Sequence, residues 1–173
     1  MSKGLVETIT EVFKPQAPLW ACELTSKHVI VAGVNSGRTQ IAAKLASELR
    51  DGQGVEAARP LVRELLSQAG FKGSEIAVVV PDETARISFM TAEKPSKNVE
   101  EQRTFIRWKL KKAVPFDVDT AQVAYQVLGP HHAGNGVDML VALSPKSIVQ
   151  EYESLFDSLE IHAGMVVPST LAV

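Results

Sequence analysis

The segment from residue 98 to residue 129, NVEEQRTFIRWKLKKAVPFDVDTAQVAYQVLG, changes its hydrophobic period at one Pro-Phe pair. Before the pair, one helical face is shared by Val99, Gln102, Ile106, Leu110 and Ala113. That spacing predicts a helix over 98–113. Pro115 cannot continue a helix, and it biases the preceding residue away from helical angles. Alternating polarity after the pair predicts a strand over 121–129. The chain is therefore restricted to folds that mix α and β elements.

The rest of the chain contains the same two kinds of element. Short apolar runs bounded by turn residues predict seven more strands, over 19–24, 28–34, 39–49, 75–81, 85–93, 137–144 and 162–170. Residues 39–49 also fit a helix, and their place after two hairpin-spaced strands favours a strand. Apolar residues at helical spacing predict helices over 60–70 and 144–160, the second with Ser144 as N-cap and Pro145 at its first position.

The first 16 residues predict a separate short helix and linker. One helical face would hold Leu5, Val6, Ile9, Val12 and Phe13, and the sequence KPQAP follows them. So small an apolar face does not hold a helix folded in isolation. We expect it to dock on the chain's own core, in preference to a partner or a membrane surface.

Composition excludes several classes of function. The chain has 173 residues and a net charge of -2, whereas nucleic-acid binders usually carry a basic excess. Its single cysteine, Cys22, allows no intramolecular disulfide and alternates with apolar neighbours, which favours burial over catalysis. No apolar run approaches the ~20 residues of a membrane helix, and the N-terminus has no signal-peptide pattern. These features are typical of a soluble cytoplasmic protein.

The basic helix carries Arg103, Arg107, Lys109, Lys111 and Lys112, which raises the question of nucleic-acid binding. Its polar face also includes acidic residues, so a solvated helix face is favoured. Trp108 and Phe105 form a second apolar patch on this helix. The patch would pack on another part of the chain or on a partner, and internal packing is slightly favoured because buried tryptophans are common.

No stretch of the sequence contains a complete active site. GVNSGRT, at residues 33–39, looks like a phosphate loop, but it has three residues instead of four between its glycines and Arg in place of Lys. We interpret it as a turn. His131 and His132 lie in a glycine-rich loop without further ligands at metal-binding spacing, which favours a surface loop over a metal site.

Four stretches, taken in order, resemble the N-terminal half of the PilM-like proteins, the actin-like cytoplasmic proteins of type IV pilus assembly. They are VVVPDETARISF, FIRWKLKKAVPFDVDTAQVAYQVLG, VDMLVALSPKSIVQEYESLFDSLEIHAG and MVVPSTLAV. The cytoplasmic domain of GspL and the cell-division protein FtsA share this layout. The order of the predicted elements resembles the family over residues 17–173. The resemblance of local sequence motifs begins near residue 76.

The resemblance implies an α/β fold, with a partial actin-like (ribonuclease H-like) subdomain and an inserted β-α-β-β-α subdomain. Residues 17–83 and 162–173 would form the actin-like part, and residues 84–161 would form the insert. The helix and linker at 1–16 would precede both. In this layout the basic helix is the first helix of the insert.

Actin-like proteins bind ATP between two domains, so the resemblance raises the possibility of a nucleotide site. Its first phosphate loop would include Glu23, Thr25, Ser26 and Lys27. That turn lacks the glycine needed for close approach to phosphate, and an ordinary hairpin turn is favoured. The family's second phosphate and adenosine motifs are also missing from this chain. We therefore expect no enzymatic activity and no cofactor, with Mg²⁺-ATP bound only in a complete two-domain protein. The alternative is an actin-like ATPase subunit.

The function implied by the resemblance is protein–protein assembly at the cytoplasmic side of the inner membrane, in a type IV pilus or a related type II secretion platform. The family's partner is PilN, a membrane protein whose short cytoplasmic tail docks into a groove. Phe105, Trp108 and Phe116 are the expected partner contacts. We expect membrane contact only through the partner, no nucleic-acid binding, and self-association as a further possibility.

Overall fold

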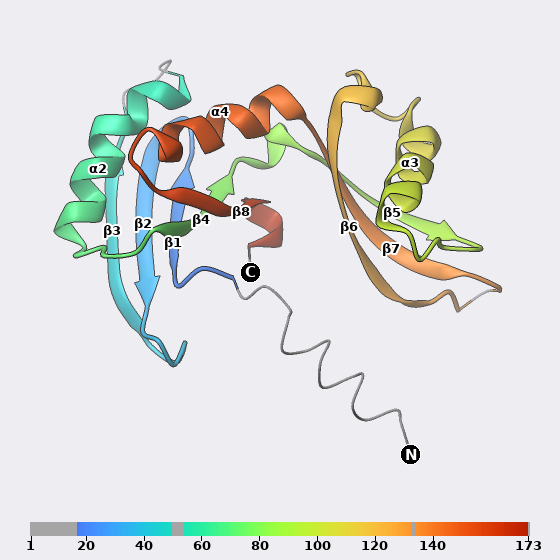
Figure 1. Cartoon of the computed structure of the whole chain (residues 1–173), viewed down its shortest axis with the longest axis horizontal. Helices are drawn as coiled ribbons and strands as arrows, with labels where there is room; N and C mark the ends of the chain where they lie inside the picture. The colour runs from blue at the N-terminus through green and yellow to red at the C-terminus, as the bar shows by residue number, and fades with distance from the viewer. Residues whose placement is uncertain (1–16, 50–53, 133, 173) are drawn as a thin grey trace.

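The computed structural model describes residues 17–49, 54–132 and 134–172, which form two lobes lying side by side (Figure 1). The expected N-terminal helix falls outside the described residues. The first lobe contains a five-stranded sheet and two helices. The second contains a three-stranded sheet and one helix. Within the described residues, no helix is long and apolar enough to cross a membrane.

The sheet of the first lobe has the strand order β3-β2-β1-β4-β8. Its strands are β1 (Trp20–Leu24), β2 (His28–Val34), β3 (Ile41–Glu48), β4 (Glu75–Val80) and β8 (His162–Pro168). The first three are antiparallel, and β1, β4 and β8 run parallel. The predicted third strand over 39–49 is thus confirmed as β3.

One face of this sheet forms the core of the first lobe. Alternate residues of β1, β2 and β4 join buried side chains of α2 (Arg59–Gln68) and α4 (Lys146–Asp157) in a single apolar cluster. Phe156 and Leu155 of α4 are fully buried there, with Val62 of α2. Pro60 lies in the first turn of α2, as predicted, and Gly70 follows the helix with a φ of 74°.

The second lobe has the strand order β5-β7-β6. Its strands are β5 (Arg86–Ala92), β6 (Ala121–Pro130) and β7 (Val137–Pro145), all antiparallel to their neighbours. Helix α3 (Val99–Leu110) packs on one face, where Ile106 and Gln102 are buried against Met139 and Val141. The opposite face, which includes Phe89 and Leu140, has no helix on it among the described residues.

Four short 3₁₀ turns complete the described chain, at Val55–Ala58 (η1), Asp82–Thr84 (η2), Val118–Thr120 (η3) and Ser169–Leu171 (η4). The chain passes from the first lobe to the second through η2, and it returns where β7 leads into α4. Both crossings lie close together, because the Ser144 hydroxyl donates to the Thr84 carbonyl oxygen at 2.7 Å.

Three details differ from the expectations. Helix α3 ends at Leu110, three residues before the predicted end. Ser144 does not cap α4: Pro145 occupies the N-cap position, and the Ser144 hydroxyl bonds to Thr84 instead. The expected insert ended at residue 161, yet α4 belongs to the core of the first lobe, because its apolar face packs on the five-stranded sheet. By core packing, the second lobe ends near Pro145.

Candidate functional site

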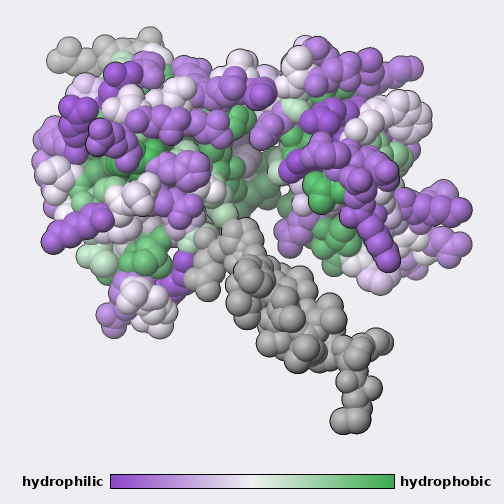
Figure 2. All heavy atoms as spheres, viewed as in Figure 1, coloured by the Kyte–Doolittle hydropathy of each residue, from purple (hydrophilic) through white to green (hydrophobic). Residues whose placement is uncertain are grey.

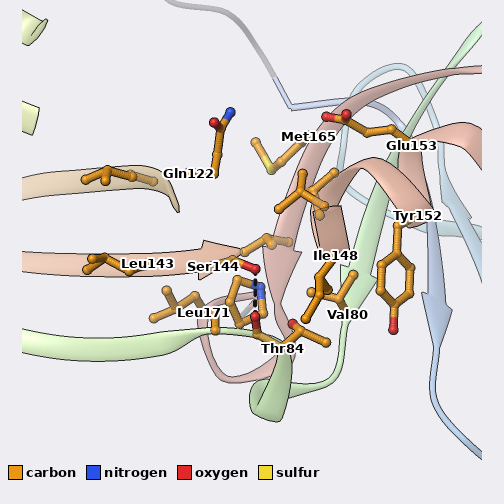
Figure 3. A pocket seen from close by; sticks show the side chains of 18 of the residues that line it. Val80, Thr84, Gln122, Leu143, Ser144, Ile148, Tyr152, Glu153, Met165 and Leu171 are labelled. Carbon is orange, nitrogen blue, oxygen red and sulfur yellow. Dashed lines mark hydrogen bonds between the residues drawn. The ribbon is translucent and has the colours of Figure 1, made fainter. Parts of the chain in front are cut away.

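A cleft with a volume of about 340 Å³ lies between the two lobes. Figure 2 shows this hollow, with hydrophobic residues inside it. One wall comes from α4 and β8 of the first lobe, and the other from β6 and β7 of the second. The site thus uses four consecutive elements of the chain, two from each lobe. Figure 3 shows their side chains from close by.

Helix α4 contributes Ile148, Tyr152 and Glu153 to the first wall. The helix is fixed there because the rest of its apolar face is buried in the first core. Burial raises the pKa of the Tyr152 hydroxyl above its ordinary value, and the nearby carboxylates of Glu151 and Glu83 add to this effect. The Tyr152 hydroxyl is therefore protonated at physiological pH, and Tyr152 is one of the lining residues of the cleft.

Strand β8 contributes residues 164–168 to the same wall, and Met165 is 40% exposed. This strand lies at the edge of the five-stranded sheet and pairs only with β4 among the described strands. Backbone N–H and C=O groups on its other side have no strand partner in the described structure. A free strand edge beside an apolar cleft is suited to pairing with an extended peptide.

The second wall is formed by the start of β6 and the end of β7. Gln122 and Ala124 of β6 are exposed, and Ala142 of β7 lies on the same face of the sheet. Arg103 of α3 reaches this wall, where its guanidinium donates to Glu100 at 2.6 Å. Gln122 and Met165, labelled in Figure 3, come from opposite walls.

The base of the cleft is held by bonds between segments that are distant in sequence. Besides the bond from Ser144 to Thr84, the carboxylate of Asp82 accepts from the backbone N–H of Thr170 at 2.9 Å and from its hydroxyl. The Thr170 hydroxyl is the main cause that holds the pKa of Asp82 below its ordinary value, and the backbone bond adds to it. These bonds join η4, at the end of β8, to the crossing between the lobes.

The lining is suited to binding an apolar ligand. Its side chains are mostly apolar, and Glu153 is the one carboxylate among the described lining residues. The Ser144 hydroxyl donates to a backbone carbonyl, so it is not activated by a base. In the described part of the chain, no group of three or more His, Cys, Asp or Glu residues could hold a metal ion.

The turn that was weighed as a first phosphate loop is a hairpin turn between β1 and β2. The Thr25 hydroxyl accepts from the backbone N–H groups of Lys27 and His28, at 3.2 and 2.9 Å, and the Thr25 N–H donates to the His28 carbonyl oxygen. These donors point into the turn, so they are not free to hold a phosphate. Glu23, Thr25, Ser26 and Lys27 do not fit a nucleotide phosphate in this conformation.

The three predicted partner contacts do not line the cleft. Trp108 is 70% exposed on α3, with its ring 6.2 Å from that of Phe105. It borders a shallow depression of about 250 Å³ with Arg107 and Lys111. Phe105 and Phe116 are partly buried against the second core. The favoured internal packing of Trp108 is therefore wrong for the described structure, while partner binding by these residues stays a prediction.

Two other expectations, a turn at residues 33–39 and burial of Cys22, are confirmed. Residues 33–39 form a turn, in which the Asn35 carboxamide oxygen accepts from the Thr39 N–H at 2.9 Å. Cys22 is fully buried, and burial raises the pKa of its thiol to about 12. His131 Nδ1 lies 2.8 Å from an Asp138 carboxylate oxygen.

The cleft residues themselves were not predicted from the sequence. The walls combine Ile148 and Met165 of the first lobe with Gln122 and Ala124 of the second, and no local pattern joins these positions. The exposure of Met165, which would mark the site, is known only from the structure.

Comparisons with known proteins identify the fold. No protein-family profile matches the sequence, and no curated protein sequence matches it. Among solved structures, a chain of a PilM–PilN type IV pilus biogenesis complex superposes with a TM-score of 0.71 and 17% identity, over 92% of this chain and 48% of that chain.

Two other solved structures share the architecture. The cytoplasmic domain of EpsL, an inner-membrane component of the type II secretion system of Vibrio cholerae, gives a TM-score of 0.60 and 11% identity, over 89% of this chain and 58% of that one. A Bacteroides thetaiotaomicron protein with an actin-like ATPase fold and unknown function gives 0.52 and 10%, over 87% and 51%. The fold is thus the predicted partial actin-like fold, and the chain spans about half the length of these proteins.

Proposed function

We propose that this chain is a non-enzymatic binding module of a type IV pilus or type II secretion-like assembly platform. In this proposal it acts in the cytoplasm, at the inner membrane, through membrane-bound partners. Its ligand is the extended cytoplasmic tail of a PilN-like membrane protein, and the tail binds in the cleft between the lobes. The likeness to a chain of a PilM–PilN complex supports this choice of partner.

The observation that carries the proposal is the free edge of β8 beside an apolar cleft. An extended tail could add as a further strand next to residues 164–168. Its alternate side chains would then enter the space between Ile148 and the β6 wall. Backbone pairing supplies affinity in such complexes, and the side-chain pockets supply specificity.

The first test is a calorimetric titration with a synthetic peptide of a PilN-like cytoplasmic tail. We expect saturable binding by the wild-type chain. Met165→Arg places a charge in the apolar cleft and should weaken binding at least about tenfold. Ile41→Arg is the matched control, because Ile41 is 69% exposed on β3, at the far edge of the same sheet. Its affinity should equal that of the wild type.

A third variant separates the cleft from the helix surface. Trp108→Ala should leave tail binding unchanged, because Trp108 is not among the residues that line the cleft. Loss of binding in Trp108→Ala, with Met165→Arg unaffected, would place the partner on α3 and refute the cleft. Mg²⁺-ATP titrated into the same sample should give no saturable heat, and a saturable signal would favour the ATPase alternative.

A further inference from the structure

Two of the strands at the edges of the two sheets, β3 and β6, carry features that oppose pairing with another chain. Native proteins protect exposed edges with lysine, proline and irregular register. Strand β3 contains Lys44, and its pairing shifts opposite Gly33. Strand β8 borders the cleft, and its free edge is the one assigned above to the partner's tail. Strand β6 ends at Pro130, with a shift after Val127.

Strand β5 lacks these features. It is the outer strand of the three-stranded sheet, and its seven residues pair with β7 without a register shift. It contains neither proline nor lysine, and its one charged residue, Arg86, is at its start. Its middle residue, Phe89, is 77% exposed, more than any other large apolar side chain described.

Phe89 lies on the sheet face that is turned away from α3. It pairs with Leu140 of β7, whose neighbours Met139 and Val141 point into the core. Ile87 is on the same face as Phe89, because side chains two residues apart share a face. This edge therefore combines free backbone groups with the exposed Phe89 and the half-buried Ile87.

We propose that β5 pairs with β5 of a second copy of this chain, antiparallel and about a twofold axis at Phe89. The two Phe89 side chains then lie directly opposite each other. Ile87 faces Thr91 of the second copy, and Arg86 faces Ala92, so no like charges are opposed. Aromatic pairs across antiparallel strands are favourable, and a twofold interface of this kind closes after two copies. The result is a continuous six-stranded sheet.

The second copy is the occupant that this edge fits best, because the strand is complementary to itself. Phe89 is the middle residue of β5. In the symmetric register, the two Phe89 side chains therefore cover each other. The pairing leaves the cleft free, since no residue of β5 is among those that line it. One strand pair buries less than the ~1,200 Å² typical of stable complexes, so we expect weak association, with a dissociation constant on the order of micromolar.

Sedimentation velocity over about 1 to 500 µM protein tests the proposal. The wild-type chain should convert from monomer to dimer and form no larger species. Phe89→Lys should weaken the dimer at least about tenfold, because it places two like charges opposite each other. Ile41→Lys, at an edge position on β3 that is 69% exposed, should dimerise like the wild type. A wild type that stays monomeric, or that assembles without limit, would refute the proposal.

Hydrogen exchange of the wild-type chain locates the interface without a variant. Amides of residues 86–92 should exchange more slowly at high than at low protein concentration, because pairing protects the edge. Concentration-dependent protection at residues 41–48 instead would show association through β3, and it would overturn the assignment to β5. Circular dichroism of Phe89→Lys checks that the variant is folded.

Discussion

Gln102 is enclosed in the second core, although it is polar. Its carboxamide oxygen accepts from the Ser96 N–H at 2.8 Å, and its nitrogen lies 3.5 Å from the Met139 sulfur. One side chain thus fixes the loop that enters α3. The helical spacing placed Gln102 on the buried face of its helix, and the structure confirms this position. The reason for a polar residue at this position, the bond to Ser96 in the loop before α3, is seen only in the folded structure.

Gln102→Leu should destabilise the chain by about 1–3 kcal/mol, because the Ser96 N–H loses its acceptor while the volume is kept. Urea denaturation followed by circular dichroism measures the change. Gln122→Leu, an exposed position in β6, is the control and should stay within about 0.5 kcal/mol of the wild type. Equal stabilities for the two variants would contradict the role given to Gln102.

Asp82 predicts a dependence of stability on pH. Its bonds from Thr170 hold its pKa in the folded chain below the value of about 3.9 expected in the unfolded chain. The carboxylate therefore contributes stability that is fully present above that unfolded value, and this contribution is lost as the pH falls through the folded pKa. Melting temperatures of wild type and Asp82→Asn should differ near pH 6 and converge in acid. A constant difference across this range would be the contrary result.

At the scale of elements, the hydrophobic periodicity of each segment and the turn residues between segments predicted most of the fold. The residues that alternate in β6 and β7, and those on the apolar faces of α2 and α4, are the ones that the two cores bury. These elements could therefore be predicted from the sequence. Ends were harder to place, because they depend on contacts with other segments. Serine is a common N-cap residue, yet the Ser144 hydroxyl donates to the carbonyl oxygen of Thr84, which is 60 residues away in sequence.

The start of α3 offers a local test. The Asn98 side chain accepts from the N–H groups of Glu100 and Glu101, at 2.9 and 3.3 Å, so two donors of the first turn are satisfied. Asn98→Ala should cost about 1 kcal/mol in the free energy of unfolding. Lys97→Ala, one residue earlier and exposed, should have no measurable effect. Chemical denaturation of the two variants side by side decides whether the cap contributes.

At the scale of the whole molecule, the cleft could not be predicted from the sequence. Its walls meet only because the chain crosses twice between the lobes at one place, near Thr84 and Ser144. The resemblance to PilM-like proteins predicted two units and a groove, but no residue pattern placed the groove. The predicted contacts on α3 came from the local pattern around Trp108, which marks an exposed surface and carries no information about the opposite face of the lobe.

Because the two crossings are bonded to each other, the link between Ser144 and Thr84 should hold the lobes in one arrangement. Ser144→Ala removes the hydroxyl that donates to the Thr84 carbonyl oxygen. The free energy of unfolding should fall by about 1 kcal/mol. If the bond acts on the arrangement of the lobes, amides at the two crossings should exchange faster, while those of β1 and β2 should not. Thr120→Ala removes a similar hydroxyl bond, to the Asp117 carbonyl oxygen, away from the cleft. Equal exchange at the crossings in both variants would mean that core packing alone sets the geometry of the cleft.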